Sequence, residues 1–305
     1  MRVHNTHEWI DYHTPKYVQE LLAFFDHFLK GEQNGWENTP NVRISILDPN
    51  GEDVVDQAVP EWPPRNVRPT ELFLNSNDQL STQCSEDASN KIYSVDDPNG
   101  ATFTYVFEQD CDVVGYMALR LWLEAQGSDD MEIAVTAEKY GKNGEHFANV
   151  TEEGLSGSFA ATGYLRVSQR ELDQTCSTEF EPYLKHTNEQ RLTQGEIVEV
   201  NIPLWPMATR YRKGEQLRLI VKAYRPVTSV PLHFGEAPVE IAASGATFAP
   251  NKSDEEMVSL GGSPEQSPDY VHQQRFVYEQ SRNRGEHIIH FGGQYNSRLL
   301  IPVVE

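Results

Sequence analysis

The stretch Met117-Ala118-Leu119-Arg120-Leu121-Trp122-Leu123 places an apolar residue at every second position along the chain. Successive side chains of a β-strand point to opposite faces of the sheet, so this alternation predicts a strand with one buried face. The same period recurs in Val42/Ile44/Ile46, Phe103/Tyr105/Phe107, Ile133/Val135/Ala137, Val198/Val200/Ile202 and Leu217/Leu219/Val221. Two short apolar runs, Ile288-Ile289 and Leu299-Leu300-Ile301, predict further strands near the end of the chain.

Turn-forming clusters separate the predicted strands. Examples are Asp97-Pro98-Asn99-Gly100, Lys142-Asn143-Gly144 and Lys213-Gly214-Glu215. Strands that follow one another through such turns, without helices between them, favour antiparallel pairing. We therefore predict an all-β fold, an antiparallel β-sandwich of jelly-roll type, with the polar stretches 75–90 and 249–267 as loops.

One helix is predicted ahead of the sandwich. Thr14 can cap its first turn, Pro15 suits its first position, and Gly31 suits its end. Between them, apolar residues follow at helical spacing, namely Tyr17, Val18, Leu21, Leu22, Phe24, Phe25, Phe28 and Leu29. This apolar stripe must pack against a partner surface, and the polar stretch 31–40 after it is predicted to be a linker.

Composition narrows the possible partners of the 305-residue chain. Its 25 Lys and Arg residues stand against 46 Asp and Glu residues, a formal net charge of -21. Such a charge repels nucleic acids and anionic membrane surfaces. No stretch approaches the roughly 18 consecutive apolar residues of a membrane-spanning helix, and the first residues lack the apolar region of a signal peptide. We therefore expect a soluble, cytoplasmic protein that binds neither nucleic acid nor membrane.

Metal and cofactor motifs are not recognisable. Cys84, Cys111 and Cys176 are far apart and form no CxxC pair, so neither a disulfide framework nor a zinc site is expected. His7-Glu8 lacks the second histidine that a zinc-protease helix requires. The pair Asp129-Asp130 lacks the spaced oxygen ligands of a calcium loop and is interpreted as a turn cap. His287 and His290 fall on opposite faces of one predicted strand and cannot chelate together. We predict no metal site and no cofactor.

A self-sufficient serine hydrolase of the α/β type needs its nucleophile in a Gly-x-Ser-x-Gly turn between a strand and a helix. The sequence contains no such pentapeptide. Its nearest approach, Gly154-Leu155-Ser156-Gly157-Ser158, has Ser in place of the second Gly and is interpreted as a loop.

Several segments, in order along the chain, resemble the serine hydrolase family of Xaa-Pro dipeptidyl-peptidases, cocaine esterase (CocE/NonD) and α-amino acid ester hydrolases, in its C-terminal part. The segments extend nearly from end to end. One of them resembles a family segment that usually reads Ser-His-Arg-Glu-Leu-Asp, with Gln169 in place of the histidine. The segments are Arg2-Val3-His4-Asn5-Thr6-His7-Glu8-Trp9, Phe24 to Gly31, Asn34-Gly35-Trp36, Thr39 to Arg43, Gly163 to Asp173, Gly195 to Val198, Ile202 to Pro206, His287 to Gly293 and Ser297 to Pro302.

The resemblance implies a division of the chain. Residues 1–38 would be the C-terminal remnant of an α/β-hydrolase catalytic domain, including its last helix. Residues 39–305 would be the jelly-roll, galactose-binding-like C-terminal domain. The implied partner is an upstream catalytic domain, and the implied substrate is a small ester or Xaa-Pro peptide.

The resemblance also implies a Ser-His-Asp triad, in which serine and aspartate precede histidine in chain order. Both would then lie upstream of residue 1, so whether this chain is itself an enzyme stays open, and we expect it to be inactive alone. His4, just after the strand-like Arg2-Val3, is the first candidate for the catalytic base, and His7 is the alternative.

A different class of function is also compatible with the sequence. Jelly rolls commonly bind sugars, so the chain could be a free-standing carbohydrate-binding module, with Trp122, Trp205, Tyr116 and Tyr164 as stacking surfaces. It could equally be an oligomerisation module, and a homo-oligomer is compatible with either interpretation. The DNA sequence upstream of Met1 would separate these functions from an enzyme part.

Overall fold

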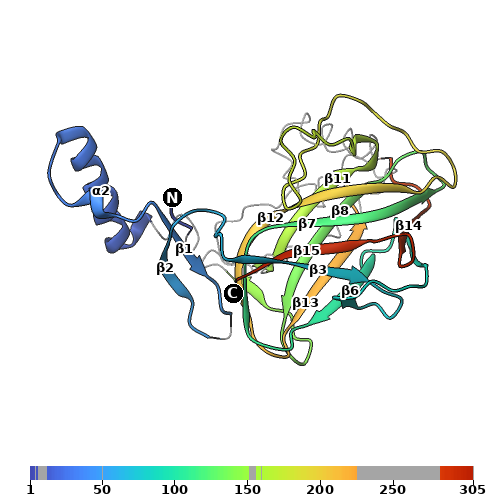
Figure 1. Ribbon diagram of the computed structural model, residues 1–305, viewed down its shortest axis with the longest axis horizontal. Coiled ribbons are helices and arrows are strands. Elements are labelled where there is room, and N and C mark those ends of the chain that lie inside the picture. Colours follow the sequence, from blue (N-terminus) through green and yellow to red (C-terminus); the bar gives the residue numbers. More distant parts are fainter. Residues whose placement is uncertain are drawn as a thin grey trace, which may run out of the picture.

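The structure is a computed structural model that describes residues 1–3, 5, 12–49, 51–150, 156–158, 160–224 and 282–304. Two antiparallel sheets pack face to face, and a hairpin and a helix lie at one end of them (Figure 1). The prediction of an all-β sandwich preceded by a helix is thereby confirmed. None of the helices within the described residues is both long and apolar enough to cross a membrane.

The larger sheet has seven strands built around the long strand β7 (Cys111–Gln126). One edge of β7 pairs with β12 (Val198–Tyr211). The other edge pairs with two strands in succession, β15 (Arg298–Val304) and β14 (Glu286–Phe291). The outer strands are β3 (Val67–Leu74), β4 (Leu80–Ser81) and β5 (Ser89–Ser94).

The smaller sheet has four strands in the order β11-β8-β13-β6. They are β6 (Ala101–Val106), β8 (Glu132–Tyr140), β11 (Ala160–Arg166) and β13 (Gln216–Ala223). Within each of the two sheets, all neighbouring strands pair antiparallel. Connections include a short 3-10 turn, η2 (Val167–Gln169), and the short pair β9 (Ala148–Val150) and β10 (Ser156–Ser158).

The hydrophobic core fills the space between the two sheets. The predicted alternation along β7 is observed, because its odd-numbered apolar residues from Met117 to Leu123 are completely buried. Residues of the opposite sheet, such as Leu219 and Phe103, belong to the same cluster. Complete burial of one such side chain contributes about 1.5–3 kcal/mol, so this interior is the main source of stability.

The hairpin of β1 (Val42–Ile46) and β2 (Val54–Val59) has a separate, smaller hydrophobic cluster. Ile44 and Ile46 pack there with Val114 of β7 and Ala208 of β12. The hairpin is therefore attached to the sandwich by apolar contacts.

Helix α2 (Pro15–Lys30) begins and ends where the sequence predicts. Thr14 is its N-cap residue, and Gly31 closes it in the left-handed conformation with φ of 73°. A 3-10 turn, η1 (Trp36–Asn38), follows before β1. In Figure 1 the helix projects from the hairpin away from the sandwich.

Two loop predictions need correction. The stretch 75–90 contains β4 and the first residues of β5, and Ser156–Ser158 form β10. All three strands are short or polar, so the sequence carries little apolar alternation that would predict them. The predicted loop 249–267 lies outside the described residues.

Candidate functional site

The two candidate base residues, His4 and His7, lie outside the described residues. The segment just before them is described and is strand-like. Arg2 forms a parallel bridge with Arg43 of β1, in which the Val3 amide donates to the Arg43 carbonyl at 2.9 Å. The first residues therefore lie alongside β1 through one isolated parallel bridge.

Polar contacts attach α2 to this hairpin. The Lys16 ammonium lies 2.6 Å from an Asp56 carboxylate oxygen, and Arg2 Nε lies 2.8 Å from the other. The Arg2 guanidinium also lies over the Tyr17 ring, 3.5 Å from its centroid. Burial by itself would raise the pKa of Asp56, but the hydrogen bonds from Lys16 and Arg2 and their positive charges together hold it below its usual value. The first half of the helix is thus fixed by charge.

The second half of α2 exposes an apolar face. The exposed fractions of Leu21, Leu22, Phe25, Phe28 and Leu29 lie between 43% and 78%. No residue of the helix is buried. An exposed apolar face of this kind on a protein is typical of an interaction surface.

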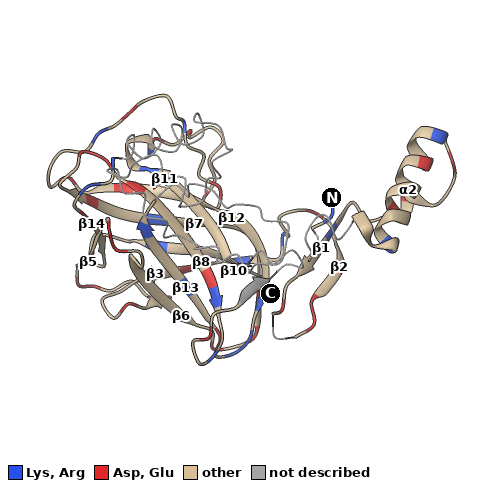
Figure 2. Ribbon diagram, turned by 180° about the vertical axis from the view of Figure 1, so that it is seen from behind, with Lys and Arg blue, Asp and Glu red and all other residues tan. Residues whose placement is uncertain are grey.

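Charge is also sparse on this helix. Its charged residues are Lys16, Glu20, Asp26 and Lys30, and most of the ribbon of α2 is tan in Figure 2. Lys16 and Glu20 are already paired with the hairpin, Glu20 through Arg43. Lys30 pairs with Asp26 one turn earlier at 2.5 Å. The charged side chains of the helix therefore form ion pairs within the chain, and they leave its apolar face without charge.

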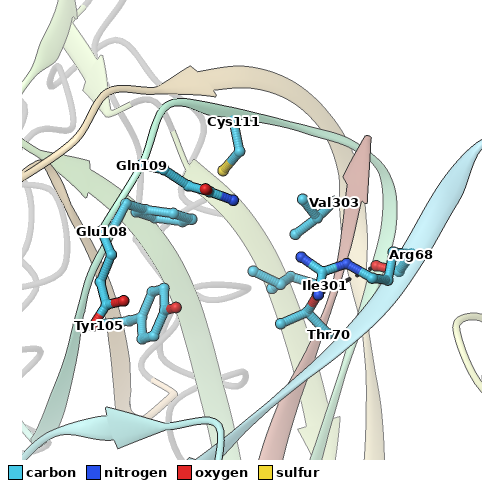
Figure 3. A pocket seen from close by; sticks show the side chains of 9 residues that line it. Arg68, Thr70, Tyr105, Glu108, Gln109, Cys111, Ile301 and Val303 are labelled. Carbon is cyan, nitrogen blue, oxygen red and sulfur yellow. Dashed lines mark hydrogen bonds between the residues drawn. The ribbon is translucent and has the colours of Figure 1, made fainter. Parts of the chain in front are cut away.

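A pocket of about 220 Å³ opens between the two sheets, at the turn from β6 into β7 (Figure 3). Its floor is apolar, because Ile301 and Val303 of β15 and Phe107 are buried. Its walls are polar and come from β3 on one side and the β6–β7 turn on the other. The wall residues are Arg68, Thr70, Tyr105, Glu108, Gln109 and Cys111.

Two groups of the pocket walls, the Cys111 thiol and the Tyr105 phenol, have raised pKa values. Burial, together with the nearby carboxylates of Asp112 and Asp110, raises the pKa of Cys111 to about 11. Burial and then the Glu108 carboxylate raise the pKa of Tyr105. Arg68 opposes both shifts, which places its positive charge close to the thiol and the phenol.

Asp130 is a buried structural carboxylate. One oxygen accepts the amide hydrogens of Met131 and Ser168, each at 2.9 Å, and the other accepts the Ser168 hydroxyl at 2.7 Å. Arg282 Nη1 lies 2.9 Å from that second oxygen. The sequence predicted a turn cap for Asp129-Asp130, whereas the Asp130 carboxylate is fully buried and bonds mainly to residues distant in the sequence.

The segment that resembles Ser-His-Arg-Glu-Leu-Asp continues from Ser168. Arg170 Nη1 donates to the carbonyls of Val167 and Gln190, at 3.1 and 2.6 Å. Glu171 accepts from Lys185 at 2.9 Å. Asp173 accepts the hydroxyl hydrogen of Thr175 at 2.6 Å. These contacts organise the connection from β11 to β12, so the segment has a structural role here.

The two histidines of β14 lie on opposite faces, as predicted. His287 is buried against Tyr93, while His290 lies on the outer face with its Nε2 2.9 Å from a Glu124 oxygen. Within the described ranges, no three His, Cys, Asp or Glu side chains are arranged to hold a metal ion.

The four aromatic residues considered for sugar stacking are distributed over both sheets. Trp205 on β12 and Tyr164 on β11 are 70% and 52% exposed. Trp122 donates its indole hydrogen to Asn296 at 3.1 Å, and the Tyr116 ring packs against Trp62, with 6.2 Å between centroids. Packing against neighbours is thus the role of the two residues on β7.

These features define the chain as a β-sandwich domain that carries, at one end, a helix with an exposed apolar face. The family described as X-Pro dipeptidyl-peptidase C-terminal non-catalytic domain matches residues 34–300, and the chain belongs to this family. The predicted resemblance is thereby confirmed. No curated protein matches the sequence significantly.

Solved structures agree with this assignment. A CocE/NonD family hydrolase from Staphylococcus aureus is 30% identical with a TM-score of 0.78, and the alignment covers 99% of this chain and 48% of that one. An aminopeptidase from the marine sediment archaeon Thaumarchaeota archaeon shares the fold, with 13% identity, a TM-score of 0.59, and coverage of 96% and 45%. An α-amino acid ester hydrolase shares it with 14% identity, a TM-score of 0.51, and coverage of 93% and 44%. The chain therefore spans about half the length of these proteins.

Proposed function

We propose that this chain is the C-terminal part of a serine hydrolase that acts on small esters or Xaa-Pro peptides, and that it is inactive alone. The observation that carries the proposal is the exposed apolar face of α2. An upstream α/β-hydrolase catalytic domain is the occupant that fits this face. Two facts support it: the family is described as non-catalytic, and this chain covers 48% of the Staphylococcus aureus hydrolase.

The contacts of the hairpin support a division between residues 1–38 and 39–305. The hairpin shares the apolar cluster of Ile44, Val114 and Ala208 with the sandwich. Between α2 and the hairpin, in contrast, the ion pairs of Lys16 and Glu20 are prominent. We therefore assign the hairpin to the sandwich domain and α2 to the catalytic domain.

In the proposed enzyme, His4 is the catalytic base and His7 is the alternative. The base would take the proton of the serine hydroxyl during attack on the acyl carbon and return it to the leaving group. The serine and the aspartate would both come from the upstream domain. The parallel bridge of Arg2 with Arg43 of β1 supports His4, because a base in this fold follows a strand end.

The experiment compares the chain alone with the chain joined to the sequence encoded directly upstream of Met1. Hydrolysis of an activated acyl ester and of an Xaa-Pro anilide is measured for both proteins. We expect turnover only in the joined protein, and we expect a serine-directed inhibitor to abolish it. Inhibitor-sensitive turnover by the chain alone would contradict the proposal.

An in-frame stop codon directly upstream would contradict it in a different way. It would leave α2 without the proposed partner and favour the binding-module interpretation. The outcome of sequencing is therefore informative before any protein is made.

A further inference from the structure

The pocket at the β6–β7 turn lies in the sandwich, apart from the segment that holds His4 and His7 in the sequence. Three separate segments form it, and Figure 3 shows side chains from both walls facing one space. The Arg68 guanidinium extends from β3, and the Gln109 amide extends toward it from the opposite wall. The Tyr105 hydroxyl and the Cys111 thiol border the same space.

The groups on these walls are mainly hydrogen-bond donors. A guanidinium provides a fork of N–H donors that matches a carboxylate, and amide, phenol and thiol groups each provide further donors. The phenol of Tyr105 and the thiol of Cys111 are protonated at neutral pH, and their pKa values are raised above the ordinary ones, so neither adds negative charge. Glu108 is the one carboxylate among the lining residues, and its side chain lies beside Tyr105, across the pocket from Arg68.

The volume of the pocket and its apolar floor indicate how large the ligand is and that part of it is apolar. The volume of about 220 Å³ lies below the range of roughly 300–1,000 Å³ that is typical of sites for drug-sized molecules. Ile301 and Val303 form an apolar floor that would accommodate a short hydrocarbon group.

We propose that this pocket binds a small monocarboxylate with a short apolar body, with Arg68 as the carboxylate-binding residue. The carboxylate would face Arg68 and Gln109, and the hydrocarbon would lie on Ile301 and Val303. The site is independent of the proposed hydrolase activity, because none of its residues belongs to residues 1–38.

The test uses the full chain and butyrate as the probe. Saturation-transfer NMR gives the dissociation constants of butyrate, of acetate, and of n-butylamine and 1-butanol as ligands without the carboxylate. We expect saturable binding of butyrate, with affinity falling about fourfold for each methylene group removed toward acetate. The amine and the alcohol are expected to bind at least about tenfold more weakly.

Two variants localise the site. Arg68→Gln removes the charge and should weaken butyrate binding by about tenfold or more, while Tyr105→Phe should weaken it by a smaller factor. The matched control is Arg65→Gln, because the Arg65 side chain is 84% exposed and is not among the pocket residues. It should leave butyrate binding unchanged. Thermal melting establishes that each variant is folded.

Three outcomes would overturn the proposal. The first is the absence of saturable butyrate binding to the parent chain. The second is equal affinity for butyrate and 1-butanol, which would make the pocket a purely apolar site. The third is equal weakening by Arg68→Gln and Arg65→Gln, which would indicate a general effect of surface charge.

Discussion

Lys139 Nζ lies 2.8 Å from a carboxylate oxygen of Glu215 inside the sandwich, where the two side chains are 0% and 3% exposed. The ammonium also donates to the Arg210 carbonyl at 2.6 Å. The same Glu215 oxygen accepts the Arg212 amide hydrogen at 2.7 Å. A buried ion pair contributes little relative to apolar residues of the same size, but removing one partner leaves an uncompensated buried charge.

We therefore predict that Lys139→Met lowers the free energy of unfolding by about 3–5 kcal/mol. The double variant Lys139→Met/Glu215→Gln should be more stable than the sum of the two single changes implies, because it removes both charges. Chemical denaturation measures all of these values. Lys142→Met, at an exposed lysine of the following turn, should stay within about 0.5 kcal/mol of the parent. If the double variant loses as much stability as the two single variants together, the two buried charges do not compensate each other and this account is wrong.

Acid should destabilise the sandwich through His287. Its Nδ1 lies 3.1 Å from the Tyr93 hydroxyl, and its buried Nε2 has no hydrogen-bond partner in the part of the chain that the structure describes. Burial lowers the pKa of His287 to about 4, from an ordinary value of 6.5. Below pH 6.5, His287 binds a proton in the unfolded chain but stays neutral in the folded chain. The free energy of unfolding therefore falls as the pH drops toward 4.

The two pKa values correspond to a loss of about 3 kcal/mol across this window. His287→Gln should make the unfolding free energy less dependent on pH between 6.5 and 4 by a similar amount. The comparison is with the parent and with His13→Gln, which replaces an exposed histidine. An unchanged pH profile in His287→Gln would show that other groups cause the acid sensitivity.

Much of the sandwich is predictable from the sequence, because its central strands bury one face completely. The alternation along Met117 to Leu123 and that of Leu217/Leu219/Val221 both match strands whose apolar residues are fully buried. The ends of α2 are equally predictable, since Thr14 and Gly31 mark them by backbone preference. Edge strands are different. In β5, Ser89–Ser94, only Tyr93 is buried, so pairing with β14 defines the strand.

The sites are less predictable for physical reasons. The burial of Lys139 is indicated by its position, because it is the next inward-facing residue after Ile133, Val135 and Ala137. Its charge, however, argues against burial when only the apolar pattern is considered. The pocket is not indicated by any sequence pattern, because Arg68, Gln109 and Ile301 are brought together only by the pairing of strands that are distant in the sequence. The assignments of His4 and His7 stay predictions.

The exposed face of α2 should make the chain self-associate in the absence of a partner. Each Å² of apolar surface removed from water contributes about 25 cal/mol, and several large side chains are available. Leu21→Asp/Phe25→Asp should shift the chain toward monomer in sedimentation velocity experiments. The control Gln19→Asp/Lys30→Gln changes the net charge by the same amount at polar positions and should sediment like the parent. Equal sedimentation of both double variants would mean that this face is not an interface.

The catalytic assignment is tested in the joined protein, where the upstream domain supplies the serine and aspartate. If His4 is the base, His4→Ala should lower kcat/KM by about 10²–10⁴-fold, because proton transfer in the transition state is lost. His7→Ala and the exposed-histidine control His13→Ala should cost much less. The thermal midpoint of all three variants should stay near that of the parent, because a base exerts its effect in the transition state rather than through packing. A collapse of kcat/KM in His7→Ala, with a near-parental value in His4→Ala, would move the base to His7. If neither change lowers kcat/KM, neither histidine is the catalytic base. The chain would then contribute to the enzyme only through surfaces of α2 and the sandwich that pack on the catalytic domain.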